Sequence, residues 1–145
     1  MNANGPTAPS RRLVLLVVGP PCAGKSTLAA QLAQQYDAQV VDFDAIARSL
    51  GSKSSHDHPP SIARLAVREQ QRMERRVALA RVGAWVVVRT AADPVQRRHL
   101  TVQLRADEVW FVDPGRDVVT ERARRLRPRQ SLDAIADWYR LNPAE

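Results

Sequence analysis

One stretch of the chain reads Leu13-Val14-Leu15-Leu16-Val17-Val18-Gly19-Pro20-Pro21-Cys22-Ala23-Gly24-Lys25-Ser26-Thr27. Its first six residues are apolar, which predicts a strand buried on both faces of a parallel sheet. The residues that follow have the spacing of a phosphate-binding loop, because Gly19 and Gly24 stand five positions apart and Lys25-Ser26 closes the loop. Glycine is required there where φ turns positive or where a side chain would collide with a phosphate oxygen.

The loop predicts a site for ATP or another NTP together with Mg²⁺. The backbone N–H groups of residues 19–27 would cradle the phosphates, and the helix that begins near Lys25 adds the positive end of its dipole. The Lys25 ammonium can reach the β- and γ-phosphates, and the Ser26 hydroxyl can ligate Mg²⁺. Only Lys25 and Lys53 are lysines among the 22 basic residues, so a lysine at this position indicates function more than composition. The alternative is a glycine turn with an incidental lysine.

Length and composition predict one α/β domain. With 145 residues the chain can bury one core but has no room for a separate substrate domain. No apolar run approaches the roughly 20 residues that cross a bilayer, and the run at 13–18 is too short for a secretory signal, so we expect no membrane partner and a cytoplasmic location. The single cysteine, Cys22, excludes an internal disulfide. We expect residues 1–11 to be a disordered tail and residues 12–145 to form the domain.

The chain is strongly basic. Its net charge is +7 and its pI is near 10.9, which indicates an anionic partner such as nucleic acid or a nucleotide. The alternative is a genome biased toward arginine, alanine and valine. The sequence leaves the oligomeric state open.

Strand-like and helix-like segments alternate along the chain. This alternation predicts βαβ crossovers and a three-layer α/β P-loop NTPase domain with a mostly parallel sheet of four or five strands. The expected strands are 13–18, 38–43, 84–88 and 108–112, and the expected helices are 26–35, 44–50, 62–82, 94–105, 117–125 and 132–140. Residues 51–61, rich in serine and proline, predict a mobile loop. We interpret His56 and His58 in this loop as solvated residues rather than metal ligands.

Two carboxylates follow the second expected strand. Ligands of an open parallel sheet lie beyond the carboxyl ends of its strands, so Asp42 and Asp44 are expected near the phosphates. If the chain is still extended there, both side chains lie on one face. We expect Asp44 to accept the proton of an acceptor hydroxyl, and Asp42 to hold Mg²⁺ with Ser26, directly or through water. The alternatives are that Asp44 caps a helix starting at Ala45 and that Asp42 is a solvated strand end.

Arginines supply the other expected contacts. Arg89 follows the third strand, where it could bind a phosphate or pair with Asp93 or Asp113. Arg122 and Arg125 lie three positions apart, so they can share a helical face and close over a triphosphate as part of a lid around residues 122–130. The lid also contains Arg124, Arg127 and Arg129. The alternative is a solvated basic helix end.

The chain resembles the small P-loop kinases of the AAA type, especially polynucleotide 5′-kinase domains of the phage type and their nucleoside kinase and zeta-toxin-like relatives. The resemblance rests on the loop at 19–27, on Val41-Asp42-Phe43-Asp44 followed by Arg48, and on the segments Val112-Asp113-Pro114 and Glu121-Arg122-Ala123-Arg124-Arg125. It implies that Asp44 activates the acceptor hydroxyl and that Arg48, or the backbone near it, positions the substrate. It also implies that Arg122 and Arg125 are lid arginines. One departure is Arg89-Thr90, where relatives commonly carry an aspartate, which leaves Mg²⁺ with fewer protein ligands.

These features predict a kinase that transfers the γ-phosphoryl group of ATP to a hydroxyl of a nucleic-acid-like acceptor, meaning a nucleoside, a nucleotide or a polynucleotide end. We expect Asp44, Arg48 and Arg89 to contact that acceptor. Two alternatives stay open. One is a nucleotide-dependent, nucleic-acid-associated ATPase or a degenerate kinase, which the Arg89-Thr90 ending favours. The other is a kinase of a small metabolite or antibiotic.

Overall fold

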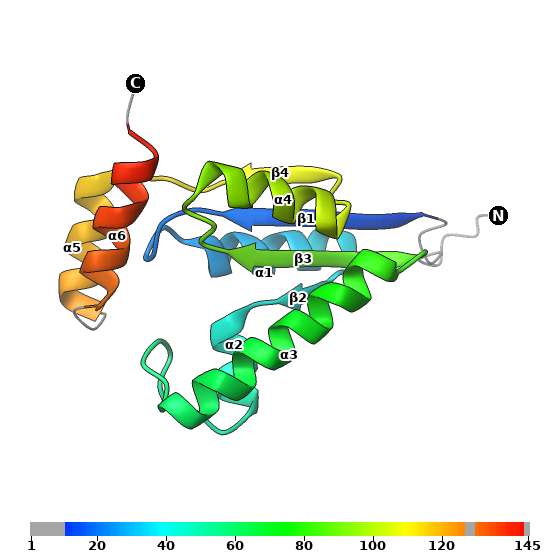
Figure 1. Ribbon diagram of the computed structural model, residues 1–145, viewed down its shortest axis with the longest axis horizontal. Helices are drawn as coiled ribbons and strands as arrows, with labels where there is room; N and C mark the ends of the chain where they lie inside the picture. Colours follow the sequence, from blue (N-terminus) through cyan, green and yellow to red (C-terminus); the bar gives the residue numbers. More distant parts are fainter. Residues whose placement is uncertain (1–10, 127–129, 144–145) are drawn as a thin grey trace.

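The computed structural model describes residues 11–126 and 130–143. A parallel sheet of four strands in the order β2-β3-β1-β4 forms its centre (Figure 1). The strands are β1 (Arg12–Val18), β2 (Gln39–Val41), β3 (Gly83–Arg89) and β4 (Glu108–Phe111). The helices are α1 (Lys25–Tyr36), α2 (Phe43–Ser49), α3 (Pro60–Leu79), α4 (Pro94–Leu104), α5 (Arg116–Leu126) and α6 (Gln130–Leu141). The predicted alternation of strands and helices is confirmed.

The first strand, β1, lies between β3 and β4 and pairs with both. Its residues Arg12–Val18 pair in parallel with Gly83–Arg89, and its second half pairs in parallel with Glu108–Phe111. The residues from Val14 to Val18 are fully buried, as the apolar run predicts. Burying one such side chain is worth about 1.5–3 kcal/mol. Because all pairs are parallel, the carboxyl ends of the strands meet at one edge of the sheet.

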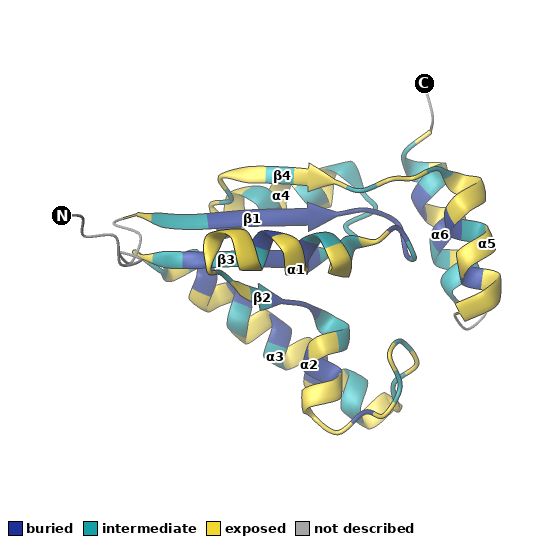
Figure 2. Cartoon of the chain, turned by 180° about the vertical axis from the view of Figure 1, so that it is seen from behind, coloured by how far each residue is buried: buried dark blue, intermediate teal, exposed yellow. Residues whose placement is uncertain are grey.

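Helices cover both faces of the sheet, which makes three layers (Figures 1 and 2). On one face, Ala29 and Leu32 of α1 belong to the same buried cluster as Leu15 and Val17 of β1. The opposite cluster includes Val14, Leu16, Val18, Ile46, Ala66, Val77, Leu100 and Leu104, from β1, α2, α3 and α4. The side chains of β1 alternate between the two clusters, because successive residues of a strand point to opposite faces.

The last two helices, α5 and α6, form a pair beyond the carboxyl ends of the strands, at the left of Figure 1. Val119 of α5 and Ile135 of α6 belong to one buried cluster with Ala23 of the loop after β1. Asn142 ties the end of α6 to the turn after β3, since its Nδ2 donates a 2.7 Å hydrogen bond to the carbonyl of Ala92. These contacts hold the helical pair beside the phosphate-binding loop.

The chain around Asp42 differs from the sequence-based expectation. β2 ends at Val41 and α2 begins at Phe43, so the expected strand over 38–43 is shorter. Asp42 and Asp44 therefore do not lie on one extended face. The cause is local, because the Asp42 carboxylate accepts a 3.3 Å hydrogen bond from the backbone N–H of Asp44 and thereby caps α2. The alternative that Asp44 caps this helix is wrong.

Two predicted segments fall wholly or partly outside the described residues, the tail for most of its length and the lid for three of its residues. The proposed tail over residues 1–11 has only its last residue inside them, and Arg127 and Arg129 of the proposed lid lie outside them. Among the helices of the described part, none is long and apolar enough to cross a membrane.

Candidate active site

Two glycines of the loop between β1 and α1 stand where the backbone requires glycine. Gly24 has a φ of 101°, in the left-handed region, directly before α1. Gly19 passes so close to the chain after β4 that an added Cβ atom would collide with the carbonyl oxygen of Val112. One glycine therefore serves a left-handed turn and the other a close approach between two backbones.

Lys25 opens α1 and contacts the loop that precedes it. Its Nζ donates a 2.7 Å hydrogen bond to the carbonyl oxygen of Gly19 and another of 2.7 Å to that of Pro20. The ammonium group is therefore held against the loop. An ammonium group and the N-terminus of a helix both attract anions, and here they act at one place.

Ser26 and Asp42 meet across the sheet edge. The Ser26 hydroxyl donates a 3.0 Å hydrogen bond to Oδ2 of Asp42, a residue that is 8% exposed. At nucleotide sites Mg²⁺ takes one or two protein oxygens and completes its shell with phosphate and water. Residues 11–126 and 130–143 contain no group of three or more histidine, cysteine or acidic side chains that could hold a metal ion. The donor set of Ser26 and Asp42 thus fits a Mg²⁺ ion that arrives with the nucleotide, and metal binding itself stays a prediction.

Asp44 lies in the first turn of α2, between two histidines of the following loop. Nε2 of His58 lies 2.7 Å from Oδ1 of Asp44, and Nδ1 of His56 lies 3.1 Å from Oδ2. The His58 side chain is only 2% exposed, so its interpretation as a solvated residue is wrong. A serine-rich loop without periodicity carries no local signal of this contact. It forms because the chain turns back after α2.

Arg89 pairs with an acidic residue that sequence reasoning missed. Its Nη1 lies 2.9 and 2.8 Å from the two carboxylate oxygens of Glu74 on α3, whose side chain is 6% exposed. The partner is therefore Glu74 rather than Asp93 or Asp113. A signal was present in the sequence, because Glu74 lies eight positions after Ala66 on the buried face of α3, where an unpaired charge is costly.

The three remaining predicted arginines have different surroundings. Arg122 donates a 3.1 Å hydrogen bond from Nη1 to the carbonyl oxygen of Cys22 and so reaches the phosphate-binding loop. Arg125 forms an ion pair within α5, and its side chain is 73% exposed. Arg48 donates a 3.3 Å hydrogen bond to the carbonyl oxygen of Ser55. The structure thus brings Arg122 to the loop and places Arg125 and Arg48 away from it, and the roles expected of all three stay predictions.

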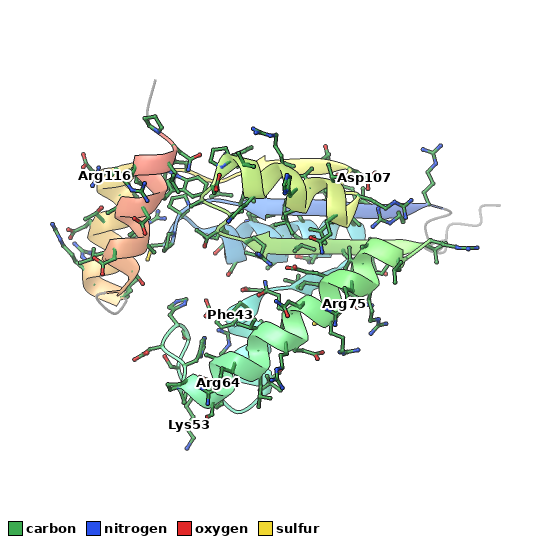
Figure 3. All side chains as sticks on the ribbon, viewed as in Figure 1. Phe43, Lys53, Arg64, Arg75, Asp107 and Arg116 are labelled. Carbon is green, nitrogen blue, oxygen red and sulfur yellow. The ribbon has the colours of Figure 1, made fainter. Side chains whose placement is uncertain are left out.

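A cleft of about 770 Å³ opens where the loop, α2, α3 and α5 meet, within the usual range for small-molecule sites. Figure 3 labels one of its lining residues, Phe43, at the start of α2 next to the end of β2. The loop, the start of α1 and α5 contribute Pro21, Cys22, Ala23, Gly24, Lys25, Ser26, Thr27, Arg122 and Leu126 to the lining. The segments after β2 and β3, together with α3, contribute Asp42, Phe43, Asp44, His56, Val67, Gln70, Gln71, Arg89 and Thr90. The cleft therefore has a phosphate-binding side and a second side that contains Asp44.

Fold and site together define a P-loop nucleotide-binding protein. The parallel sheet, the glycine loop, the lysine and serine that open α1, and the acid after a neighbouring strand are the parts of this class. The chain belongs to the AAA_33 family, described as an AAA domain, whose model matches residues 14–138. By family and fold it is an ATP-binding P-loop kinase, as the resemblance implied.

Solved structures share this fold. The chain is similar to a shikimate kinase from Acinetobacter baumannii in complex with shikimate, with 17% identity and a TM-score of 0.57 over 90% of this chain and 75% of that chain. It is similar to a gluconokinase from Sinorhizobium meliloti 1021, with 18% identity and a TM-score of 0.59 over 87% and 74%.

A third similar structure is the Pnkp1/Rnl/Hen1 RNA repair complex, with 15% identity and a TM-score of 0.64. The match covers 97% of this chain but 48% of that one, so this chain spans about half the length of that protein. No curated protein matches the chain in sequence. At these identities the likenesses show the fold.

Proposed function

We propose that this kinase transfers the γ-phosphoryl group of ATP, or of another NTP, to a hydroxyl of a small polyhydroxylated molecule. The observation that carries the proposal is the lining of the cleft on the side of Asp44. Gln70 and Gln71 supply neutral amide groups there, and the guanidinium of Arg89 is paired with Glu74. A polynucleotide end requires uncompensated cations along its phosphates. Among the described residues that line the Asp44 side of the cleft, the arginine, Arg89, is already neutralised by Glu74. The amides of Gln70 and Gln71 can hydrogen-bond to hydroxyl groups.

Each group of residues around the cleft would have a separate role in the reaction. Lys25 and the loop N–H groups hold the phosphates of the donor, and Arg122 adds a charge where negative charge develops on the transferred group. Mg²⁺, when held by Ser26 and Asp42, neutralises phosphate charge. Asp44 accepts the proton of the acceptor hydroxyl as the oxygen attacks the γ-phosphorus.

The comparisons support a small acceptor. Two of the similar structures are named a shikimate kinase and a gluconokinase, and the first contains shikimate. Their identity to this chain is too low to transfer a substrate, so the acceptor class rests on the cleft lining.

A phosphoryl-transfer screen tests the proposal. The purified protein would be incubated with γ-labelled ATP and Mg²⁺ and three panels of acceptors: polyols, sugars and sugar acids; nucleosides and nucleotides; and oligonucleotides with a 5′-hydroxyl. We expect labelled product in the first panel and none with the Lys25→Ala variant. Label on oligonucleotides alone would contradict the proposal. Release of ADP without labelled product would indicate a nucleotide-dependent ATPase.

A polynucleotide end is the second candidate acceptor, which specific surface charges favour. The chain carries a net charge of +7, and the spacing of the exposed residues Arg64, Arg68 and Arg75 places them along one stripe of α3. Figure 3 labels Arg64 and Arg75 on this helix. The likeness to the RNA repair complex agrees with this candidate. If it is correct, transfer to oligonucleotides will fall steeply as salt is raised, because phosphate contacts release counterions.

A further inference from the structure

The segment between α2 and α3 contacts Asp44 at two separate atoms. His58 meets Oδ1 at 2.7 Å, and His56 meets Oδ2 at 3.1 Å. An ionised carboxylate accepts hydrogen bonds at both of its oxygens, and here each oxygen has one histidine of this segment beside it. Both oxygens of the proposed base are therefore already oriented by this segment.

Ser52 holds the opposite side of the His58 ring. Its Oγ lies 2.6 Å from Nδ1 of His58, and Ser52 is 7% exposed. The ring also packs edge-on against Phe43, with ring centroids 5.7 Å apart and an interplanar angle of 66°. Because a carboxylate can only accept, Nε2 of His58 carries the proton toward Asp44, whether Ser52 donates to Nδ1 or accepts from it. The three residues form a hydrogen-bonded chain that ends on Oδ1.

The two histidines differ in exposure and in contact length. The His58 side chain is 2% exposed, whereas the His56 side chain is 30% exposed and lines the cleft. The contact of His56 is also the longer one. Oδ1 is therefore the buried, anchored oxygen, and Oδ2 is the oxygen on the side of the cleft.

We infer that His58, held by Ser52, is a positioning residue that anchors Oδ1 of Asp44, and that the acceptor hydroxyl takes the place of His56 at Oδ2. The inference rests on the proposed function, because it assigns a task to each oxygen of the proposed base. The acceptor oxygen forms a bond to the γ-phosphorus while the bond from that phosphorus to the β–γ bridging oxygen breaks. The acceptor proton moves to Oδ2, the nucleoside diphosphate leaves with the electron pair, and the proton then passes to solvent.

Anchoring one oxygen has a kinetic consequence. An aspartate side chain can rotate about two torsions, and only some rotamers direct a lone pair at the acceptor. A displacement of about 1 Å can cost about a hundredfold in rate. The anchor would thus act on the rate of transfer and leave nucleotide binding unchanged, since the donor phosphates lie against the loop.

Two substitutions at His58 separate positioning from packing. His58→Phe keeps an aromatic ring beside Phe43 but removes the donor, whereas His58→Gln keeps an N–H group at similar reach. We expect His58→Phe to lower kcat by about tenfold to a hundredfold with KM for ATP unchanged, and His58→Gln to recover kcat to within about fivefold of the original protein. Equal losses in the two variants would overturn the inference, because they would indicate packing alone.

A substitution at His56 tests the other oxygen of Asp44, and one at Asp57 provides the matched control. His56→Ala is expected to change KM for the acceptor more than kcat, and a change in kcat alone would overturn its assigned place at Oδ2. Asp57→Asn alters an exposed residue between the two histidines and is expected to behave as the original protein. Thermal melting and calorimetry with MgATP establish that each variant is folded.

A measurement without acceptor distinguishes this inference from the proposed function. Nitrogen-15 NMR of the histidine rings reports which nitrogen carries the proton. We expect His58 to be protonated at Nε2, and its ring signals to shift in Asp44→Asn and Ser52→Ala but not in Asp57→Asn. If they shift while no acceptor is ever phosphorylated, the proposed function fails and the anchor stands. If they do not respond to Asp44→Asn, the anchor is refuted whatever the activity.

Discussion

The hydroxyl of Ser26 donates a 3.0 Å hydrogen bond to Oδ2 of Asp42, while Oδ1 of the same carboxylate accepts from the backbone N–H of Asp44. The first contact joins the start of α1 to the end of β2, although β3 separates β1 from β2 in the sheet. The second caps α2, the helix that carries Asp44. Asp42 therefore links the start of α1, next to the phosphate-binding loop, to α2, the helix that carries the proposed base.

Substitutions at Asp42 separate its two tasks. Asparagine still offers a capping oxygen, so we expect Asp42→Asn to melt close to the original temperature, whereas Asp42→Ala loses the cap and about 1 kcal/mol of stability. Both should require more Mg²⁺ for activity, because a carboxylate charge is lost. Thermal melting and Mg²⁺ titrations measure the two effects, and equal melting temperatures for the two variants would contradict the cap.

Lys25→Ala is expected to remove NTP binding. The ammonium is hydrogen-bonded within the loop, and loss of a charged partner at such a site costs about 2–5 kcal/mol of binding free energy. Calorimetry with MgATP and MgGTP measures the change. Lys53→Ala removes the same charge from an exposed loop position and should leave the affinity unchanged. Undiminished binding by Lys25→Ala would refute the assigned phosphate site.

Asp44→Asn is expected to spare ATP binding and to lower kcat by about 10²- to 10⁴-fold, the usual contribution of general acid–base catalysis. Asparagine keeps the shape of the side chain and an oxygen that can accept from His58, so the loop should stay in place although the negative charge beside the His58 ring is lost. Calorimetry and the labelled-ATP assay measure the two properties separately. Transfer at the original rate would rule out Asp44 as the base.

Arg122 and Arg125 are expected to differ, although both belong to the predicted lid. Arg122 contacts the carbonyl of Cys22 and lines the cleft, so Arg122→Ala should lower kcat by about a hundredfold. Arg125 is paired within α5 and largely exposed, so Arg125→Ala should change kcat by less than about threefold. Steady-state kinetics on both variants test the difference, and equal losses would show that the lid changes position during the reaction.

The ion pair between Arg89 and the buried Glu74 is expected to stabilise the fold. Arg89→Met leaves the Glu74 carboxylate buried and unpaired, which should cost about 1–3 kcal/mol of unfolding free energy. The double variant Arg89→Met with Glu74→Leu should recover most of that loss, because both charges are gone. Denaturant unfolding of the two proteins gives the comparison. A double variant as unstable as the single one would mean that packing, not charge, explains the loss.

Much of the nucleotide-binding side of the cleft could be predicted from the sequence. The spacing of Gly19, Gly24 and Lys25 and the apolar run before them depend on local backbone geometry, which a short stretch of residues encodes by itself. The position of Asp42 near the phosphate-binding loop was expected from the rule that ligands lie beyond the carboxyl ends of parallel strands, but its direct hydrogen bond with Ser26 was not. The helix expected over 44–50 begins one residue earlier, at Phe43, because the Asp42 carboxylate caps it.

The neighbours of Asp44 and Arg89 could not be predicted in the same way. His58 and Asp44 are 14 positions apart, and Glu74 and Arg89 are 15 positions apart, each pair on different segments. Within the described residues, the sequence by itself determined the phosphate-binding loop and the alternation of strands and helices, because both depend on short-range spacing. Only the tertiary structure decided which side chains surround the proposed base, because those contacts arise where separate segments pack against one another.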